Sequence, residues 1–140
     1  MATLSLVVRR FIDASPARLF EAWTTPAQLQ AWWGPQGVRC THAEIEPRVG
    51  GRLRIGNELP DGRTLFIVGE FLEFIPPEKL VYTWKIEPGV HASERVTVRF
   101  EARGAATEVI IVHERITDET ARDEHSAGWS GCLDGLVAYV

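Results

Sequence analysis

The amino-acid sequence predicts an α+β fold, with an antiparallel sheet of six to seven strands, two short helices after the first strand and a long C-terminal helix. Seven short segments are rich in β-branched and aromatic residues, and turns containing Gly or Pro separate the last six of them. Apolar residues near the C-terminus recur with helical spacing. A length of 140 residues, 45% of them hydrophobic, is typical of a single domain spanning residues 1–140.

The first predicted strand, residues 3–12, is followed by two helix starts in quick succession. Ser15 is suited to cap a helix and Pro16 to occupy its first position. Thr25 and Pro26 repeat this arrangement, and Gln28, three residues after Thr25, is placed to complete a capping box. We therefore expect two short helices that are separated at Pro26.

Strand-like segments and turns then alternate as far as the last helix. The predicted strands cover residues 38–47, 51–59, 64–75, 79–87, 93–102 and 107–116. The predicted turns contain Gly50-Gly51, Pro60-Asp61-Gly62, Pro76-Pro77, Pro88-Gly89 and Gly104-Ala105. Apolar residues occupy alternate positions, such as Leu80, Tyr82, Trp84 and Ile86 in one strand and Val96, Val98 and Phe100 in the next. One face of the sheet is therefore expected to be buried.

The closing helix is predicted to begin near Thr120. Its apolar stripe contains Ala121, His125, Trp129, Cys132, Leu136 and Tyr139, and a second stripe beside it contains Gly128, Gly131 and Gly135. Each glycine inside a helix costs about 0.5–1 kcal/mol relative to alanine. Such a cost indicates either a close approach of the helix to its neighbours or space for a pocket, and the sequence leaves both explanations open.

Four stretches, in this order, resemble the bacterial single-domain members of the START-like (SRPBCC) superfamily, in the group named after the activator of Hsp90 ATPase. They read SPARLFEAWTTPAQLQAWWGP, EIEPRVGGRLRI, FIPPEKLVYTW and HSAGWSGCLDGL. The resemblance implies the helix-grip fold, in which a curved sheet wraps around the C-terminal helix, usually with a cavity between them. Members of the wider superfamily carry or process lipids, sterols, polyketides and plant hormones. The resemblance therefore implies one fold but does not imply one function.

The expected cavity would be lined by aromatic rings and a few polar groups, which is typical of small-molecule sites. Its predicted lining residues are Trp33, Tyr82, Trp84, Phe100, His113, His125, Gly128, Trp129, Cys132 and Leu136. His113 continues an inward-facing strand row and His125 lies on the apolar stripe, so both imidazoles can face one interior. There they would orient a ligand or move a proton. The alternative, that each lies at the rim, stays open.

Other catalytic and metal sites are not predicted. Cys40, His42, Glu44 and Glu46 alternate along one strand, but Ala43 and Ile45 are better suited to the interior, so the polar row is expected to face water. We therefore predict no metal and no cofactor. Cys132 is interpreted as a small buried hydrophobic residue, because His125 lies two turns away, about 10 Å along the helix.

Charge and patterning restrict the class of partner. The net charge is −4 and the arginines are scattered, which argues against a nucleic-acid-binding face. No apolar run reaches the roughly 20 residues that span a bilayer, so membrane insertion is not predicted. The N-terminus lacks the charge order of a signal peptide, and the two cysteines form no disulfide framework, so a cytoplasmic location is expected.

The leading hypothesis is the binding of a lipophilic or aromatic small molecule between the sheet and the closing helix. The alternative is a protein-interaction module, either a chaperone partner or a homodimer. The Hsp90 version is weakened because the eukaryotic co-chaperone carries an additional N-terminal domain for which this chain has no room. The third is a cyclase-like or hydratase-like enzyme with His113 or His125 as acid–base, although no acid–base pair stands out and we do not predict an enzyme. The ligand, the oligomeric state and any continuation beyond Val140 stay open.

Overall fold

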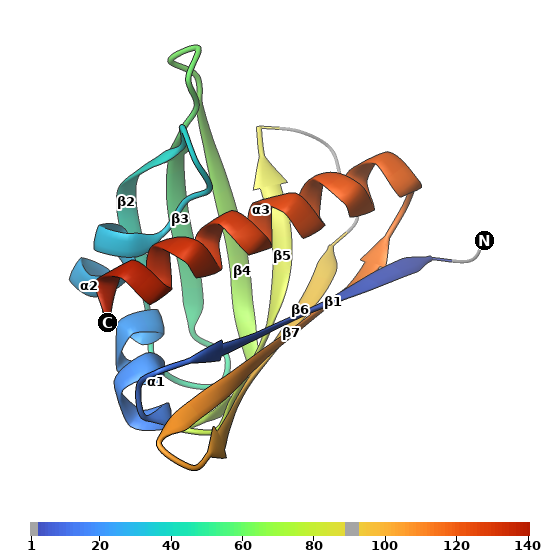
Figure 1. The fold of residues 1–140 in the computed structure, drawn as a ribbon. Coiled ribbons are helices and arrows are strands. Elements are labelled where there is room, and N and C mark those ends of the chain that lie inside the picture. The colour runs from blue at the N-terminus through green and yellow to red at the C-terminus, as the bar shows by residue number, and fades with distance from the viewer. Residues whose placement is uncertain (1–2, 89–92) are drawn as a thin grey trace.

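The computed structural model describes residues 3–88 and 93–140 and places them in seven strands and three helices (Figure 1). All neighbouring strands are antiparallel, and the sheet order is β1-β7-β6-β5-β4-β3-β2. The strands are β1 (Leu4–Ile12), β2 (Arg39–Ile45), β3 (Arg52–Glu58), β4 (Thr64–Ile75), β5 (Lys79–Glu87), β6 (Glu94–Arg103) and β7 (Ala106–Ile116). The helices are α1 (Pro16–Thr24), α2 (Pro26–Trp32) and α3 (Glu119–Tyr139). The predicted helix-grip fold is confirmed; of the predicted turns, Gly89 lies outside the described residues.

Helix α3 lies across one face of the curved sheet, and its C-terminus ends beside α2 (Figure 1). That face carries the alternating apolar rows of β5 and β6, with Leu80, Val96 and Val98 fully buried. On the helix, Leu133 and Leu136 are likewise fully buried. Burial of a row of large side chains on one face is what holds sheet and helix together, since each such side chain contributes about 1.5–3 kcal/mol.

Helices α1 and α2 begin where the sequence predicts, but only one of the two predicted caps forms. The Ser15 hydroxyl accepts a hydrogen bond from the Arg18 N–H at 3.1 Å. The capping box expected at Thr25 is wrong, because the Thr25 side chain makes no capping hydrogen bond. Gln28 instead donates from its side chain to the Glu21 carboxylate at 2.7 Å, so it joins α2 to α1 rather than closing the end of α2.

The glycine stripe of α3 serves both purposes that the sequence left open. A Cβ atom on Gly135 would lie 2.4 Å from the carbonyl oxygen of Trp32, and one on Gly131 would lie 2.8 Å from Cα of Pro35. These two glycines therefore allow the helix to approach α2 and the segment that follows it. Gly128 has no atom within 4 Å of the equivalent position, so it leaves space instead.

An irregularity in β2 changes the expected order of its side chains. The register between β2 and β3 shifts between Cys40 and His42, as at a β-bulge, so strict alternation is interrupted there. Cys40 is consequently buried in the core, and the expectation that it shares a water-facing row with His42 is wrong. His42 and Glu44 remain at the surface, with Nε2 and Oε2 3.3 Å apart.

Candidate functional site

A cavity of about 270 Å³ lies between α3, strands β3 to β5 and the segment after α2. Its walls are mainly apolar, and these five parts of the chain supply them. The lining residues are Trp33, Pro35, Val38, Asn57, Leu59, Leu65, Ile67, Trp84, Ile86, Glu124, His125, Gly128, Trp129 and Cys132. Its volume lies just below the range of about 300–1,000 Å³ in which most small-molecule sites fall.

The predicted lining residues divide into two groups. Trp33, Trp84, His125, Gly128, Trp129 and Cys132 lie in the cavity wall. Tyr82, Phe100, His113 and Leu136 do not, and all four are buried in the core. The ring of Tyr82 packs edge-on against Phe71, and that of Phe100 against Phe20. Ile86 was missed as a lining residue although it shares the inward row of Trp84, which was signal enough to find it.

Three indole rings meet around the cavity. The ring centroids of Trp33 and Trp129 are 5.4 Å apart with the rings nearly perpendicular, and those of Trp84 and Trp129 are also 5.4 Å apart. The Trp33 N–H donates to Oδ1 of Asn57 at 2.9 Å, which satisfies both buried groups. The buried N–H of Trp84 has no hydrogen-bond partner among the described residues. This nitrogen has almost no accessible surface, so Trp84 contributes an apolar ring surface to the cavity wall.

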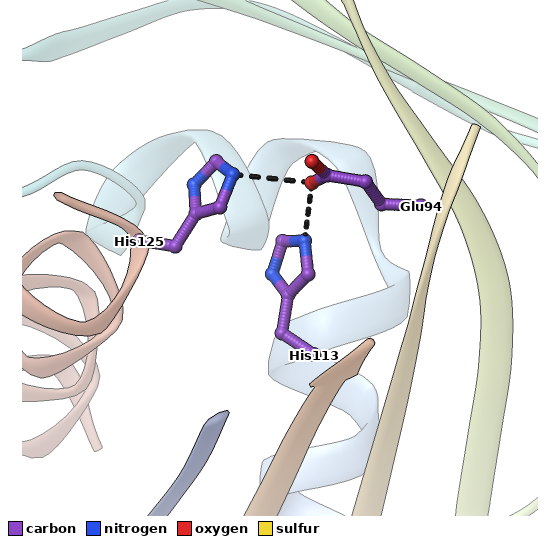
Figure 2. A group of neighbouring side chains, drawn as sticks. All are labelled: Glu94, His113 and His125. Carbon is purple, nitrogen blue, oxygen red and sulfur yellow. Dashed lines mark hydrogen bonds and ion pairs between the residues drawn. The ribbon is translucent and has the colours of Figure 1, made fainter. Parts of the chain in front are cut away.

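A cluster of one carboxylate and two imidazoles lies at the edge of this cavity. Figure 2 shows Glu94 from the start of β6, His113 from β7 and His125 from α3, with one carboxylate oxygen facing both rings. Oε1 of Glu94 lies 2.7 Å from Nε2 of His113 and 3.1 Å from Nε2 of His125. The two imidazole rings are nearly parallel, with their centroids 4.4 Å apart. The N–H of Trp129 donates to Nδ1 of His113 at 3.0 Å and so joins the cluster to the cavity wall.

Comparison with known proteins shows to which family the chain belongs. The model of the family described as activator of Hsp90 ATPase homolog 1-like protein matches residues 13–140. The chain belongs to this family. The predicted resemblance is thereby confirmed, and the fold is that of a member of the START-like superfamily.

Solved structures with the same fold come from several bacteria. Protein CV1439 from Chromobacterium violaceum is 27% identical, with a TM-score of 0.89 over 97% of this chain and 96% of that one. The AHSA1 protein from Silicibacter pomeroyi is 24% identical, with a TM-score of 0.83 over 96% of each chain. CalU16 from Micromonospora echinospora is 22% identical, with a TM-score of 0.76 over 99% of this chain and 86% of that one. The comparison with curated protein sequences found no match. None of the described helices is long and apolar enough to span a membrane.

The electrostatics of the cluster favour a charged carboxylate beside a neutral His113. Burial alone would raise the pKa of Glu94, but the hydrogen bond from His113 and the contact with His125 outweigh it and lower that pKa to about 2. Burial lowers the pKa of His113 by more than the neighbouring Glu94 carboxylate raises it. Burial also raises the pKa of the Cys132 thiol to about 12, so this thiol stays protonated and unreactive, as its interpretation as a buried hydrophobic residue requires.

The cluster has the residue types of a metal site, and it was not predicted from the sequence. The ligand atoms of Glu94, His113 and His125 all lie within 4.8 Å of one another. A metal on Nε2 of His113 would require the ring proton to move to Nδ1. The Trp129 N–H already points at Nδ1 and offers no acceptor, so the two hydrogens would face each other. In known sites the second nitrogen of a metal-bound histidine donates its proton to an acceptor, and Trp129 does the opposite. The arrangement therefore does not fit a metal.

Proposed function

We propose that this protein binds an aromatic or lipophilic small molecule in the cavity between the sheet and α3, in the cytoplasm. The observation that carries the proposal is the apolar cavity of about 270 Å³ walled by Trp33, Trp84 and Trp129. Flat indole surfaces at differing angles suit a ligand with one or two fused rings, since offset and edge-on contacts between aromatic rings are favourable. The small volume argues against a long-chain lipid or a sterol.

Gly128 supports the same proposal. It lines the cavity, and a Cβ atom at this position would meet no atom within 4 Å outside the adjoining backbone of its own helix. Alanine would therefore fit there and would favour the helix by about 0.5–1 kcal/mol. Packing alone gives no reason for a glycine at this position, whereas a bound ligand beside the helix does.

The test is the binding of 7-methoxycoumarin, a neutral two-ring probe, followed by quenching of tryptophan fluorescence. We expect saturable binding to the wild-type protein and at least a tenfold loss of affinity in Gly128→Leu, whose side chain would fill the cavity. Ala127→Leu is the matched control, because Ala127 is the neighbouring exposed position of the same helix. Unchanged affinity in Gly128→Leu, with the variant folded by circular dichroism, would contradict the proposal.

A protein-interaction role is the second candidate. Val7 and Phe11 are 55% and 64% exposed, lie on the same face of β1, and β1 forms one edge of the sheet. Exposed apolar side chains on an edge strand are typical of contact surfaces. Sedimentation of the wild type and of Val7→Ser/Phe11→Ser tests a homodimer, and a pull-down with bacterial Hsp90 tests the chaperone version. A monomeric wild type that retains no Hsp90 would exclude both.

A further inference from the structure

The hydrogen bonds around His113 define the protonation of the cluster. An indole N–H only donates, so Nδ1 of His113, which receives the Trp129 N–H, must carry a lone pair. The ring proton of neutral His113 is therefore on Nε2, where it is donated to Oε1 of Glu94. His113 holds Glu94 in place as a carboxylate and takes no second proton while the bond from Trp129 persists. It is a positioning residue.

His125 is the member of the cluster that faces a ligand. It lines the cavity, and its Nε2 lies 3.1 Å from the same oxygen of Glu94. With a proton on Nε2 toward the carboxylate, the lone pair is on Nδ1, which takes part in no hydrogen bond among the described residues. Among the described residues, the titratable groups in contact with the His125 ring are Glu94 on β6 and His113 on β7, and Glu124 of its own helix lines the same cavity.

We propose that the cavity takes a ring compound with a weakly acidic hydroxyl, a phenol or an enol, and that His125 accepts its proton. The O–H bond of the ligand breaks, the proton passes to Nδ1 of His125, and the electron pair stays on the ligand oxygen. The imidazolium is then balanced by the Glu94 carboxylate on its other side. This inference rests on the proposed function, because it names the ligand class of the same cavity.

The ring geometry supports this assignment. The ring of Trp84 meets that of His125 edge-on, with centroids 5.9 Å apart, so a flat aromatic surface lies beside the proton-accepting ring in the cavity wall. Low local polarity strengthens the ion pair between the imidazolium and Glu94, since most of the remaining wall is apolar. A carboxylate behind an imidazole is the arrangement that increases the proton affinity of the imidazole in acid–base catalysis.

The experiment compares 7-hydroxycoumarin with 7-methoxycoumarin, which has the same ring system and no acidic proton. The ionisation midpoint of 7-hydroxycoumarin, read from the absorbance of its anion, is measured free and with saturating protein. We expect the bound midpoint to fall by about one pH unit, which corresponds to a tenfold preference for the anion. His125→Gln and Glu94→Gln are expected to abolish this shift, each variant being measured at a concentration that saturates the probe.

Glu114→Gln is the matched control for Glu94→Gln. Glu114 is the next residue after His113, but it pairs with Arg95 at 3.1 Å and takes no part in the cavity wall, so the full shift should persist. Binding of 7-methoxycoumarin with an unshifted midpoint for 7-hydroxycoumarin would overturn this inference and leave the proposed function intact. Failure of both probes to bind would overturn both. A third outcome would also overturn this inference. If the midpoint of 7-hydroxycoumarin fell only after equimolar Zn²⁺ was added to the wild type, and did not fall in Glu94→Gln with Zn²⁺, the cluster would bind a metal rather than accept a proton.

Discussion

The two halves of α3 contain residues of the same kinds, small and apolar, but different parts of the protein surround them. In the half from residue 131 onward, Gly131 and Gly135 lie against Pro35 and Trp32, and Asp134 pairs with Arg10 of β1 at 2.8 Å. In the half up to residue 130, Gly128 faces open space and His125 and Trp129 line the cavity. Helix α2 covers only the C-terminal half, so a glycine there permits close packing, whereas a glycine before it leaves room.

This difference teaches that a small-residue stripe has no single structural meaning. The closed half gains stability from contact and has no tolerance for added atoms, as expected of a close-packed interior. The open half contains buried polar groups that need hydrogen-bond partners. The side chains around its cavity also lack the van der Waals contacts that a filled interior would provide. Stability is concentrated in one half and the candidate site in the other, and substitutions should separate the two.

The largest effect is expected from Gly135→Ala in the closed half. The added Cβ would lie 2.4 Å from the Trp32 carbonyl oxygen, which is backbone and cannot turn aside. Overpacking of this kind outweighs the better helix propensity of alanine, and we expect a net loss of about 2–3 kcal/mol in the free energy of unfolding. Urea denaturation measures it. A variant as stable as the wild type would mean that α2 shifts freely and that the half is not closed.

A smaller loss is expected from Trp129→Phe in the open half. Phenylalanine keeps an aromatic ring in contact with Trp33 and Trp84, but it leaves buried Nδ1 of His113 without a donor. An unsatisfied buried group of this kind costs about 1–2 kcal/mol. The double variant with His113→Leu should lose less stability than the sum of the two single losses, because the nitrogen that Trp129→Phe leaves unsatisfied is then absent. Additive losses would show that the Trp129–His113 hydrogen bond contributes nothing.

Acid should weaken the open half in two stages. His113 has a lowered pKa in the folded state, so its contribution is complete above about pH 6.5 and is lost as the pH falls below that value. Glu94 has its pKa lowered from 4.5 to about 2, so its contribution is present above pH 4.5 and is lost between pH 4.5 and 2. His113→Gln should therefore lose less stability than the wild type between pH 7 and pH 5, as urea denaturation at the two pH values would measure.

The control for that pH series is His42→Gln. His42 also stands beside a glutamate, but its side chain is 42% exposed at the surface of β2. His42 lies outside the cluster of Glu94, His113 and His125, so the difference between the two variants isolates the contribution of His113. Equal pH dependence in His113→Gln and the wild type would show that His113 does not titrate differently on folding.

The sequence alone predicted the sheet, its buried face and the three helices, because those features depend on local periodicity and turn residues. The bulge at Cys40 was not predictable, since it depends on how β2 pairs with β3. The cap at Thr25 failed because Gln28 finds partners on the preceding helix, a choice that only tertiary structure decides. The division of the glycine stripe depends in the same way on where α2 ends.

The candidate site was only half predictable. His113 and His125 were expected on one interior, and the structure places their rings in contact. Glu94 was missed, although it precedes Val96, Val98 and Phe100 in the inward row of β6 and the alternation alone indicated its direction. What the sequence could not show is that β7 and α3 bring two histidines to this one carboxylate, because no local pattern relates residues 94, 113 and 125.

The smallest effect on stability is expected from Gly128→Ala, and it has the opposite sign to that of Gly135→Ala. Nothing opposes the added methyl group, so helix propensity alone applies and the free energy of unfolding should rise by about 0.5–1 kcal/mol. The same methyl group would enter the cavity, so affinity for 7-methoxycoumarin should fall even as the fold gains stability. Greater stability with weaker binding is an outcome that general disruption of the fold cannot produce. If stability and affinity fell together, the space beside Gly128 would belong to the packing of the helix rather than to a ligand.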